Sequence, residues 1–540
     1  MSKRGVEWVW AVPPEDELRA VADALVRGVL PEGATVIKEN RPRSVWAVPD
    51  VAGGLLIKHY RVRGKDALRA LVTPGRAERE FRAMETLCTV GLPTVRPLGY
   101  ADRRQGAWLK EAWFIGRLVP EAQTLGEAMA AGHVDPWVLA LQAAGVVARL
   151  HDHDVWHRDL HAGNLLLTQD DELLIIDLHS MWRVPSVTLR MRTGNLAHLL
   201  HSMRAWIHLD DAPRFVSEYA RVRGERIDVL LPRVRAALER FETDYVRGRS
   251  ARCMRNSSEF VGETGPGVRV HRLRRYEREL LEHDLADHER VAREGGPALL
   301  GDAPRCRVSR VDDPNGARVV KHYLDRGLFP SWRVRLGLGK ARSAWHAARR
   351  CDVVGVPTAT ALALREDRDG SAYLVTDEVP QAVSLETYAQ DLIGEEATAE
   401  RRRVAFIVGH IVGRLSRAGL RHDDMSTKNL LLTPGTARST GDLRTTPPPG
   451  LPQVVLIDLD NMARTAPHDP AALVRMLGQL GDLPPWVTRA DRRRFAAGFA
   501  LGAGRALPVA VVSRADALTR IRQARRANLE RAAAAAGSVS

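Results

Sequence analysis

The chain is 540 residues long and 45% hydrophobic, which is enough for two large domains with packed cores. No stretch approaches the roughly 18 apolar residues of a membrane span, and the start of the chain lacks the apolar core of a signal peptide, so we expect a cytoplasmic protein.

The net charge of +14 favours an anionic partner, such as the inner face of the cell membrane or a phosphorylated glycolipid. Nucleic acid is an unlikely partner, because no base-reading motif accompanies the charge. The four cysteines lie far apart with no Cys-x-x-Cys pair, which argues against a disulfide framework or a zinc site.

The predicted elements begin with a helix over 14–29, which has apolar residues at helical spacing. Short strand-like runs follow at 34–38, 44–48 and 55–60. A second helix is expected from Ala77, then a strand-like run at 112–115 and a long helix over roughly 137–151. After Asp177 the chain is expected to be mostly helical to about residue 290.

The same series of motifs occurs twice. Four motifs of the first half return in the second half at offsets of 260 to 265 residues, with Lys58-His59-Tyr60 returning as Lys321-His322-Tyr323. Offsets this steady indicate a tandem duplication. After residue 433 the offset rises to about 281, which locates an insertion in the Pro-, Thr- and Gly-rich segment 433–453.

The repeat predicts a domain organisation in which two similar domains follow each other. The expected parts are an N-terminal helical extension (1–30), a first domain (31–260), a linker or helical connector (261–295), a second domain (296–530) that contains the inserted loop, and a disordered tail (531–540).

Three polar residues of the first copy have a spacing that indicates chemistry. Asn164 follows Asp159 by five positions, and Asp177 ends an apolar run thirteen residues further on. This spacing is typical of the catalytic loop and the metal-binding aspartate of kinases. We assign Asp159 as the catalytic base beside the acceptor hydroxyl. Asn164 and Asp177 are the expected ligands of Mg²⁺, which prefers oxygen donors.

Lys58 closes the third strand-like run, where a kinase lysine would neutralise the phosphates of ATP. Only eight of the 80 basic residues are lysines, and two of them stand at equivalent positions before a His-Tyr pair, so surface solubility is a weak explanation for them. Glu80 on the following helix is the expected partner of Lys58, with Glu78 as the alternative. The glycine-rich phosphate loop of protein kinases is missing, and arginines such as Arg41 and Arg43 are expected to cover the phosphates instead.

These motifs resemble those of the lipopolysaccharide core kinase family, whose protein-kinase-like enzymes phosphorylate Kdo or heptose of the inner core. The residues that carry the resemblance lie within 34–260 and are Arg41-Pro42-Arg43-Ser44-Val45-Trp46, Lys58-His59-Tyr60, Glu80-Phe81, Gly91-Leu92-Pro93-Thr94, His157-Arg158-Asp159, Asn164, Ile176-Asp177-Leu178-His179, Asn195-Leu196-Ala197 and Arg214-Phe215.

The resemblance implies an α+β fold with two protein-kinase-like domains in tandem, each with a small antiparallel sheet lobe and a mainly helical lobe. It also implies ATP as the donor, Mg²⁺ as the metal and a sugar hydroxyl of an anionic glycolipid as the acceptor. Arg190 and Arg192 are candidate contacts to the phosphates or carboxylates of that acceptor.

The second copy matches the first only in part. It keeps the four polar groups expected to hold nucleotide, metal and acceptor, namely Lys321, Asp424, Asn429 and Asp458. Ala344 stands where the first copy has Glu80, and Asp423 replaces Arg158. We therefore expect catalysis in the first copy, while the second copy binds nucleotide but is slower or regulatory. Lys428 is a candidate to replace part of the missing charge, so catalysis by the second copy stays open.

Three functions remain open on the residues alone. The first is an ATP-dependent sugar or glycolipid kinase. The second is another small-molecule kinase or a protein kinase of the same fold, although the Ala-Pro-Glu motif of protein kinases follows neither Asp177 nor Asp458. The third is a tandem pseudokinase scaffold, which the losses in the second copy favour and the complete polar set of the first copy disfavours.

Overall fold

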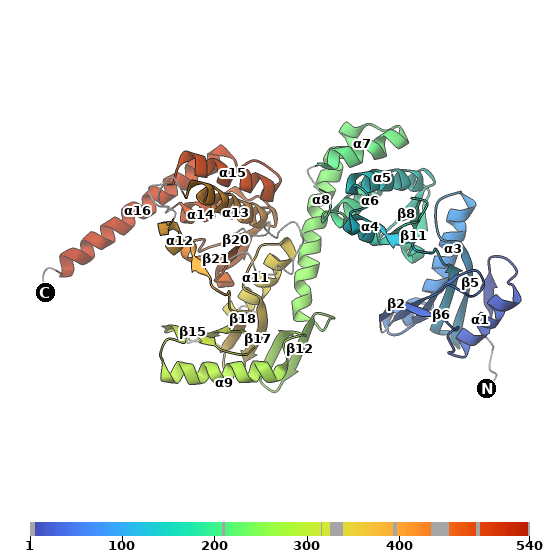
Figure 1. Cartoon of the computed structure of the whole chain (residues 1–540), viewed down its shortest axis with the longest axis horizontal. Helices are drawn as coiled ribbons and strands as arrows, with labels where there is room; N and C mark the ends of the chain where they lie inside the picture. Colours follow the sequence, from blue (N-terminus) through green and yellow to red (C-terminus); the bar gives the residue numbers. More distant parts are fainter. Residues whose placement is uncertain are drawn as a thin grey trace. The chain divides into compact units, whose positions relative to one another are not determined.

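The computed structural model describes residues 6–40, 42–207, 211–314, 316–324, 339–391, 397–433, 453–481 and 487–537. The chain divides into two units, Met1–Phe241 and Glu242–Ser540, and each unit contains a sheet lobe and a helical lobe (Figure 1). Helix α8 (Ile227–Ser250) runs across the division. Arg41 and the interior of the predicted insertion, 434–452, lie outside the described residues.

The sheet lobe of the first unit is a six-stranded antiparallel sheet with the strand order β1-β5-β6-β4-β3-β2. Its strands are β1 (Trp8–Trp10), β2 (Thr35–Asn40), β3 (Arg43–Val48), β4 (Leu55–Arg61), β5 (Pro97–Gln105) and β6 (Trp108–Arg117). Its helices are α1 (Asp16–Val26), α2 (Lys65–Arg69) and α3 (Arg76–Thr89).

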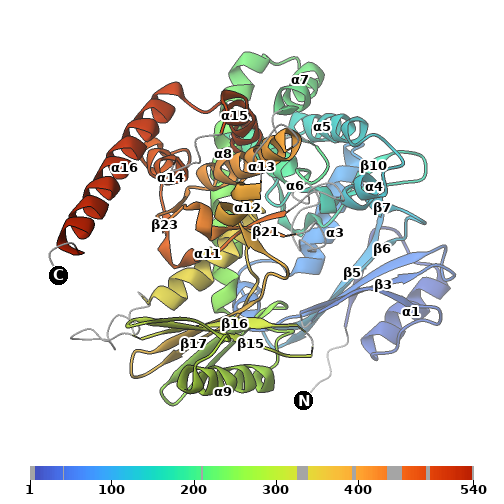
Figure 2. The same cartoon turned by 60° about the vertical axis from the view of Figure 1, so that its left-hand side comes forward.

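Strand β4 shows how this lobe presents its functional side chains. Successive side chains of a strand point to opposite faces. Leu55 and Ile57 therefore pack in the core that includes helix α1, which covers one face of the sheet (Figure 2). Lys58 and Tyr60 point to the other face, where both contact a side chain of α3.

The helical lobe of the first unit contains short strands that frame the catalytic loop. Its elements are β7 (Gln123–Thr124), α4 (Leu125–Ala131), α5 (Pro136–Asp152), β8 (Val155–His157), β9 (Leu165–Leu167), β10 (Leu173–Ile175), β11 (Met181–Arg183), α6 (Leu189–Ser202), α7 (Ala212–Arg223) and α8. Asn164 precedes β9 and Asp177 follows β10, and both lie at the open end of the β9–β10 hairpin, because Ile175 pairs with Leu165. Helix α5 begins where the Asp135 side chain accepts a hydrogen bond from the Trp137 backbone N–H, with proline at the first helical position.

The sheet lobe of the second unit is a seven-stranded antiparallel sheet with the order β12-β13-β17-β18-β16-β15-β14. Its strands are β12 (Phe260–Gly265), β13 (Val268–Leu273), β14 (Leu299–Ala303), β15 (Cys306–Val311), β16 (Arg318–Tyr323), β17 (Ala361–Asp367) and β18 (Ala372–Asp377). Helix α9 (Arg278–Glu294) lies along one face of this sheet (Figure 1, Figure 2), and α11 (Lys340–Val354) packs on the core of the other face.

The helical lobe of the second unit repeats that of the first. Its elements are β19 (Val383–Ser384), α12 (Leu385–Asp391), α13 (Thr398–Arg417), β20 (Leu420–His422), β21 (Leu430–Thr433), β22 (Gln453–Leu456), β23 (Met462–Arg464), α14 (Pro470–Leu480), α15 (Arg489–Ala503) and α16 (Val509–Gly537). The β21–β22 hairpin has the same register as β9–β10, with Leu430 opposite Leu456, so Asn429 and Asp458 again flank it.

The structure differs from the expected domain organisation at both sheet lobes. Residues 1–30 were expected to form an extension, but β1 pairs with β5 and α1 covers the sheet. Residues 261–295 were expected to form a connector, but β13 pairs with β17 and α9 covers the second sheet. The Pro266-Gly267 pair within this segment forms the turn of the β12–β13 hairpin, with Gly267 at φ 81°.

The end of the chain also differs from expectation. A disordered tail was predicted from residue 531, whereas α16 is helical to Gly537. The reason is the alanine run 532–536, since alanine has the highest intrinsic helix propensity. Among the described residues, no helix combines the length and apolar character needed to cross a membrane.

Candidate active site

Lys58 and Glu80 form a buried ion pair in the first copy. The side chain of Lys58 is 8% exposed and that of Glu80 is fully buried, so each charge depends on the other for compensation. The second carboxylate oxygen of Glu80 accepts a hydrogen bond from the Tyr60 hydroxyl at 2.7 Å. Burial and the neighbouring Glu80 charge raise the pKa of Tyr60 well above its usual value. Glu78, the alternative partner considered for Lys58, pairs with Arg82 instead.

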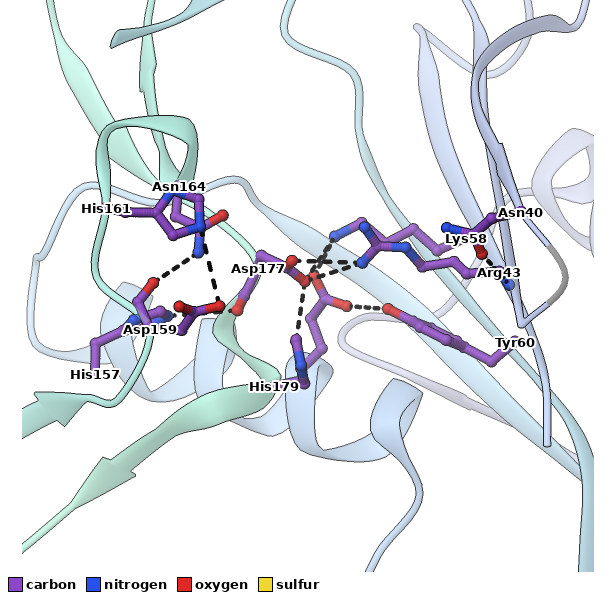
Figure 3. Close-up of polar contacts among 11 residues, drawn as sticks. Asn40, Arg43, Lys58, Tyr60, His157, Asp159, His161, Asn164, Asp177 and His179 are labelled. Carbon is purple, nitrogen blue, oxygen red and sulfur yellow. Dashed lines mark hydrogen bonds and ion pairs between the residues drawn. The ribbon is translucent and has the colours of Figure 1, made fainter. Parts of the chain in front are cut away.

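Asp177 is where the two lobes of the first unit meet (Figure 3). Its carboxylate lies 3.9 Å from Lys58 Nζ and accepts a hydrogen bond from Arg43 at 3.2 Å. It also lies 2.9 Å from Nδ1 of His179. Burial by itself would raise the pKa of Asp177, but the hydrogen bond to His179 and the charges of Lys58 and Arg43 outweigh it and hold the pKa well below its usual value. The carboxylate is therefore ionised and available for a cation.

The backbone at Asp177 is strained in the same way in both copies. Asp177 has φ 58° and its counterpart Asp458 has φ 60°, a left-handed conformation that non-glycine residues seldom adopt. Strain of this kind persists where the surrounding structure enforces it, and it is concentrated at functional sites.

Side-chain hydrogen bonds from Asn164 and Asn195 fix the backbone of the catalytic loop. Asn164 Nδ2 donates to the backbone carbonyl of Asp159 at 2.8 Å, and Asn195 Nδ2 donates to the carbonyl of His157 at 2.7 Å. The buried ring of His157 lies 3.4 Å from the Asp177 carbonyl, and burial lowers the pKa of this histidine to about 4. The Asp159 carboxylate, in contrast, is 58% exposed and faces His161 at 3.9 Å, so an acceptor molecule can reach it.

The residues of the first copy fit a hard divalent cation. The amide nitrogen of Asn164 is used by the Asp159 carbonyl, so the amide oxygen is the atom left to bind a metal. Together with the ionised carboxylate of Asp177, it supplies the oxygen donors that Mg²⁺ requires. The structure thus brings Lys58, Glu80 and Asp177 into contact and holds Asn164 on the loop that carries Asp159.

Two contacts of this site were not foreseen from the sequence. Arg43, which is expected to cover the phosphates, also hydrogen-bonds Asp177, and Tyr60 hydrogen-bonds Glu80. The repetition of Lys-His-Tyr in both copies was the available signal for Tyr60. Arg192, a candidate contact to the acceptor, forms an ion pair with Glu225 and is 17% exposed.

The second copy keeps the loop geometry but changes the partner of the lysine. Asn429 Nδ2 donates to the Asp424 carbonyl at 2.8 Å, as in the first copy. Lys321 Nζ lies 2.5 Å from Asp458, because Ala344 provides no carboxylate. The hydroxyl of Tyr323 is buried and has no hydrogen-bond partner within the described parts of the chain. The copy that lacks the glutamate therefore differs in two contacts. Lys321 pairs with Asp458, and the Tyr323 hydroxyl has no partner among the described residues.

Two further expectations for the second copy concern charge. Asp423 was predicted to place a second carboxylate beside Asp424, and it is paired with Arg421 at 2.6 Å. Lys428 was suggested as a replacement for the missing charge, but it is exposed and lies 3.7 Å from Glu386. Lys428 therefore forms a surface contact and does not compensate for the loss at position 344.

A sheet lobe with a buried lysine–glutamate pair, followed by a helical lobe with an Asp–Asn loop and a metal-type aspartate, defines a kinase-like phosphotransferase. A family model described as the lipopolysaccharide kinase (Kdo/WaaP) family matches residues 50–219 and 316–498. The chain belongs to this family, and both copies match it. The predictions of the family, of two kinase-like domains in tandem and of a phosphotransferase are thereby confirmed.

Similar proteins were found among curated sequences and solved structures. A 3-deoxy-D-manno-octulosonic acid kinase of Xylella fastidiosa (strain M23) is 30% identical over 180 residues, which are 32% of this chain and 70% of the relative. One from Xanthomonas campestris pv. campestris (strain B100) is 30% identical over 179 residues, with the same shares. A structure of WaaP in complex with acyl carrier protein is 23% identical with a TM-score of 0.33, and covers 47% of this chain and 96% of that one. The bifunctional kinase-methyltransferase WbdD is 14% identical with a TM-score of 0.24, covering 36% of this chain and 42% of that one.

Proposed function

We propose that the first copy is an ATP-dependent kinase that transfers the γ-phosphate to a sugar hydroxyl of a lipopolysaccharide-core-like glycolipid. The observation that carries the proposal is the buried Lys58–Glu80 pair beside the ionised Asp177. A buried lysine held by a glutamate is available for nucleotide phosphates. The curated relatives that bear the name 3-deoxy-D-manno-octulosonic acid kinase support this sugar as the acceptor.

Each residue has a distinct role in the proposed reaction. Asp159 accepts the proton of the acceptor hydroxyl, whose oxygen forms a bond to the γ-phosphorus while the bond to the bridging oxygen of ADP breaks. Asn164 and Asp177 hold Mg²⁺, which neutralises the charge of the phosphates. Lys58 contacts the phosphates from the sheet lobe, and Arg43 lies within reach because its guanidinium already contacts Asp177.

The second copy is proposed to bind nucleotide weakly or to regulate the first copy. The specific observation is the contact of Lys321 with Asp458, which neutralises the carboxylate that a metal would need. Retention of Asp424 and Asn429 in the same loop geometry supports residual nucleotide binding. This half of the molecule therefore also fits the alternative of a pseudokinase module.

The acceptor is proposed to be reached at the inner face of the cell membrane. The net charge of +14 supports peripheral contact with an anionic surface, whose attraction is lost as salt is added. Binding of the full chain to vesicles of anionic lipid should therefore weaken between low and physiological salt.

The proposed function is tested by phosphoryl transfer from labelled ATP by the purified full chain. Lipopolysaccharide core fragments with exposed Kdo, free sugars and a generic protein such as casein serve as acceptors. We expect label in the core fragments and none in that protein, with Asp159→Asn as the inactive control. Label in protein alone would overturn the glycolipid assignment, and calorimetry that detects no Mg·ATP binding to the chain would overturn the kinase assignment.

A further inference from the structure

A cluster of two histidines and a glutamate lies between α9 and the sheet of the second unit, on the face opposite Lys321. His288 and Glu289 come from α9 and His322 comes from β16. One nitrogen or oxygen atom from each side chain lies within 4.8 Å of the others. His288 is fully buried and His322 is 8% exposed. In both rings Nε2 is buried and has no hydrogen-bond partner among the residues that the structure describes.

The side chains of the cluster are oriented by neighbouring groups. His288 Nδ1 lies 2.7 Å from the Ser309 hydroxyl, and a hydrogen bond from Nδ1 to Ser309 leaves the lone pair on Nε2. The Tyr373 hydroxyl donates to Glu289 at 3.0 Å, and the same tyrosine ring stacks on His322 with centroids 4.0 Å apart. Metal-binding histidines and carboxylates usually have outer hydrogen-bond partners of this kind, which fix the tautomer and the ring orientation.

The first copy shows that the fold does not need these polar groups. At the offset of 263 residues, Leu25 and Val26 stand where the second copy has His288 and Glu289, and Trp46 stands in place of Ser309. The shared histidine, His59, stacks on an aromatic ring in the first copy and pairs with Glu111 at 3.1 Å. The second copy therefore has a second histidine and a carboxylate on its helix, and a hydroxyl on the neighbouring strand, where the first copy has Leu25, Val26 and Trp46.

We propose that His288, Glu289 and His322 bind a divalent transition-metal ion, with Zn²⁺ as the best chemical match. Imidazole nitrogen combined with carboxylate oxygen suits Zn²⁺, whereas Mg²⁺ and Ca²⁺ prefer oxygen donors throughout. The Glu289 side chain is 46% exposed, which gives a cation access from its side, and its Oε1 lies 3.6 Å from Nδ1 of His322. The site contains no cysteine, so the cysteine spacing could not show it.

A cation at this site would join α9 to β16. The residue that precedes His322 on β16 is Lys321, which points to the opposite face and contacts Asp458. Metal occupancy would thus restrain the strand that carries the nucleotide lysine of the second copy. The site is separate from the Mg²⁺ ligands and does not depend on phosphoryl transfer.

The test is titration of the metal-free full chain with Zn²⁺ by calorimetry and with Co²⁺ by visible absorption. We expect one site per chain with a Co²⁺ spectrum typical of nitrogen and oxygen ligands. His288→Leu, which installs the residue of the first copy, should abolish this site and its spectrum. Ser309→Ala should weaken affinity about 10–100-fold, as expected for loss of an outer partner.

His283→Ala is the matched control. His283 lies on the same helix, is 58% exposed and sits 4.0 Å from Asp287, so it is the place where a surface metal would bind. This variant should leave the stoichiometry and the spectrum unchanged. Absence of binding to the wild-type chain, or binding that survives His288→Leu and disappears with His283→Ala, would overturn the proposal. Should the His288→Leu variant unfold, Glu289→Gln provides the same test at a half-exposed position. Metal binding with full affinity by the Glu289→Gln variant would contradict the proposed ligand set.

Discussion

The two copies share one backbone hydrogen bond in their catalytic loops but hold their lysines differently, and in the second copy Asn429 also donates to the Asp424 carboxylate at 3.0 Å. In each copy the loop asparagine donates to the backbone carbonyl of the aspartate at 2.8 Å, and the metal-type aspartate has the same left-handed backbone. Lys58 is anchored by Glu80 and remains 3.9 Å from Asp177. Lys321 has no such anchor and contacts Asp458 at 2.5 Å.

This difference shows what the helix glutamate does. It takes the short contact of the lysine, so that Lys58 lies 3.9 Å from the metal-type aspartate, whereas Lys321 lies 2.5 Å from its own. In the second copy, where Ala344 takes the place of the glutamate, Lys321 forms its ion pair with Asp458. A metal would then have to compete with the ammonium group of Lys321 for the same carboxylate oxygen. A single difference on a buried helix face thus accompanies a different partner for the lysine, while the loop asparagine keeps its hydrogen bond to the backbone.

A second difference between the copies lies in the helical lobe, among the helices that support the catalytic loop. The first copy buries His151, which contacts the Tyr219 hydroxyl at 2.8 Å and the Asn195 amide oxygen at 3.1 Å. The second copy has Ser416 and Phe499 at the positions equivalent to His151 and Tyr219. The amide nitrogen of Asn195 also donates to the His157 carbonyl, so this network links the loop of the first copy to the core of its helical lobe.

The largest expected difference between the copies is in turnover. Asp159→Asn removes the proposed base and should lower kcat by about 10²–10⁴-fold, the usual range for general base catalysis. Asp424→Asn should leave kcat within about twofold, because the first copy still performs the reaction. Steady-state phosphoryl transfer by the two full-length variants checks this. Loss of activity in Asp424→Asn with normal activity in Asp159→Asn would show that the copies have been assigned the wrong way round.

The next largest effect concerns the lysine anchor. Glu80→Ala leaves the buried Lys58 ammonium and the Tyr60 hydroxyl without their carboxylate, and should destabilise the first unit by about 3–5 kcal/mol. Denaturant unfolding measures this. Glu78→Ala is the control, because Glu78 pairs with the 65% exposed Arg82 and its loss should cost about 1 kcal/mol.

The reverse substitution tests the same idea in the second copy. Ala344→Glu should draw Lys321 away from Asp458 and pair the hydroxyl of Tyr323. In a Lys58→Met background, which silences the first copy, the substitution should tighten Mg·ATP binding measured by calorimetry. Unchanged or weaker binding in a folded variant would show that the contact between Lys321 and Asp458 does not limit nucleotide binding by the second copy.

The third effect is a pH dependence at His151, whose equivalent position in the second copy is Ser416. Burial lowers the pKa of His151 from 6.5 to about 4. The unfolded chain binds a proton at this histidine near pH 6.5 and the folded chain does not, so its contribution to stability is full above pH 6.5 and is lost as the pH falls towards 4. The loss should reach about 3 kcal/mol, since each unit of pKa difference corresponds to 1.36 kcal/mol.

This pH dependence is measured by hydrogen exchange of peptides from α5 between pH 7 and 4, corrected for intrinsic exchange rates. The double variant His151→Ser/Tyr219→Phe, which carries the residues of the second copy, should have a shallower slope, while the exposed-site variant His153→Ala should behave like the wild type. Equal slopes in the double variant and the wild type would assign the dependence to other histidines.

The smallest effect distinguishes the two equivalent tyrosines. Tyr60→Phe removes the hydrogen bond to Glu80 and should cost about 1–3 kcal/mol, because a buried charged acceptor loses its donor. Tyr323→Phe removes a buried hydroxyl that has no partner in the described parts of the chain, and should be neutral or stabilising. Denaturant unfolding of both variants provides the comparison, and equal losses would show that Tyr323 has a partner in solution.

Much of this protein could be predicted from sequence because the relevant contacts are local. Asp159 and Asn164 share one loop, and Asn164 and Asp177 flank one hairpin, so their spacing alone indicates a common site. Steady offsets between the copies predicted the tandem fold for the same reason, since each lobe repeats as a continuous segment. The Lys58–Glu80 pairing could be anticipated because the helix follows the strand directly and Glu80 stands next to an apolar residue.

Long-range pairing decided the rest. The register of β13 on β17 joins residues about a hundred positions apart, and nothing in the segment 261–295 by itself distinguishes a central strand from a connector. Arg43 reaches Asp177 across 134 residues, and His322 meets His288 only because α9 packs on β16. Local spacing and composition therefore determined the family, the duplication and the catalytic loops. The tertiary structure decided which charges meet, because side chains from distant segments are brought together by sheet register and helix packing, which depend on burial of apolar surface over the whole lobe.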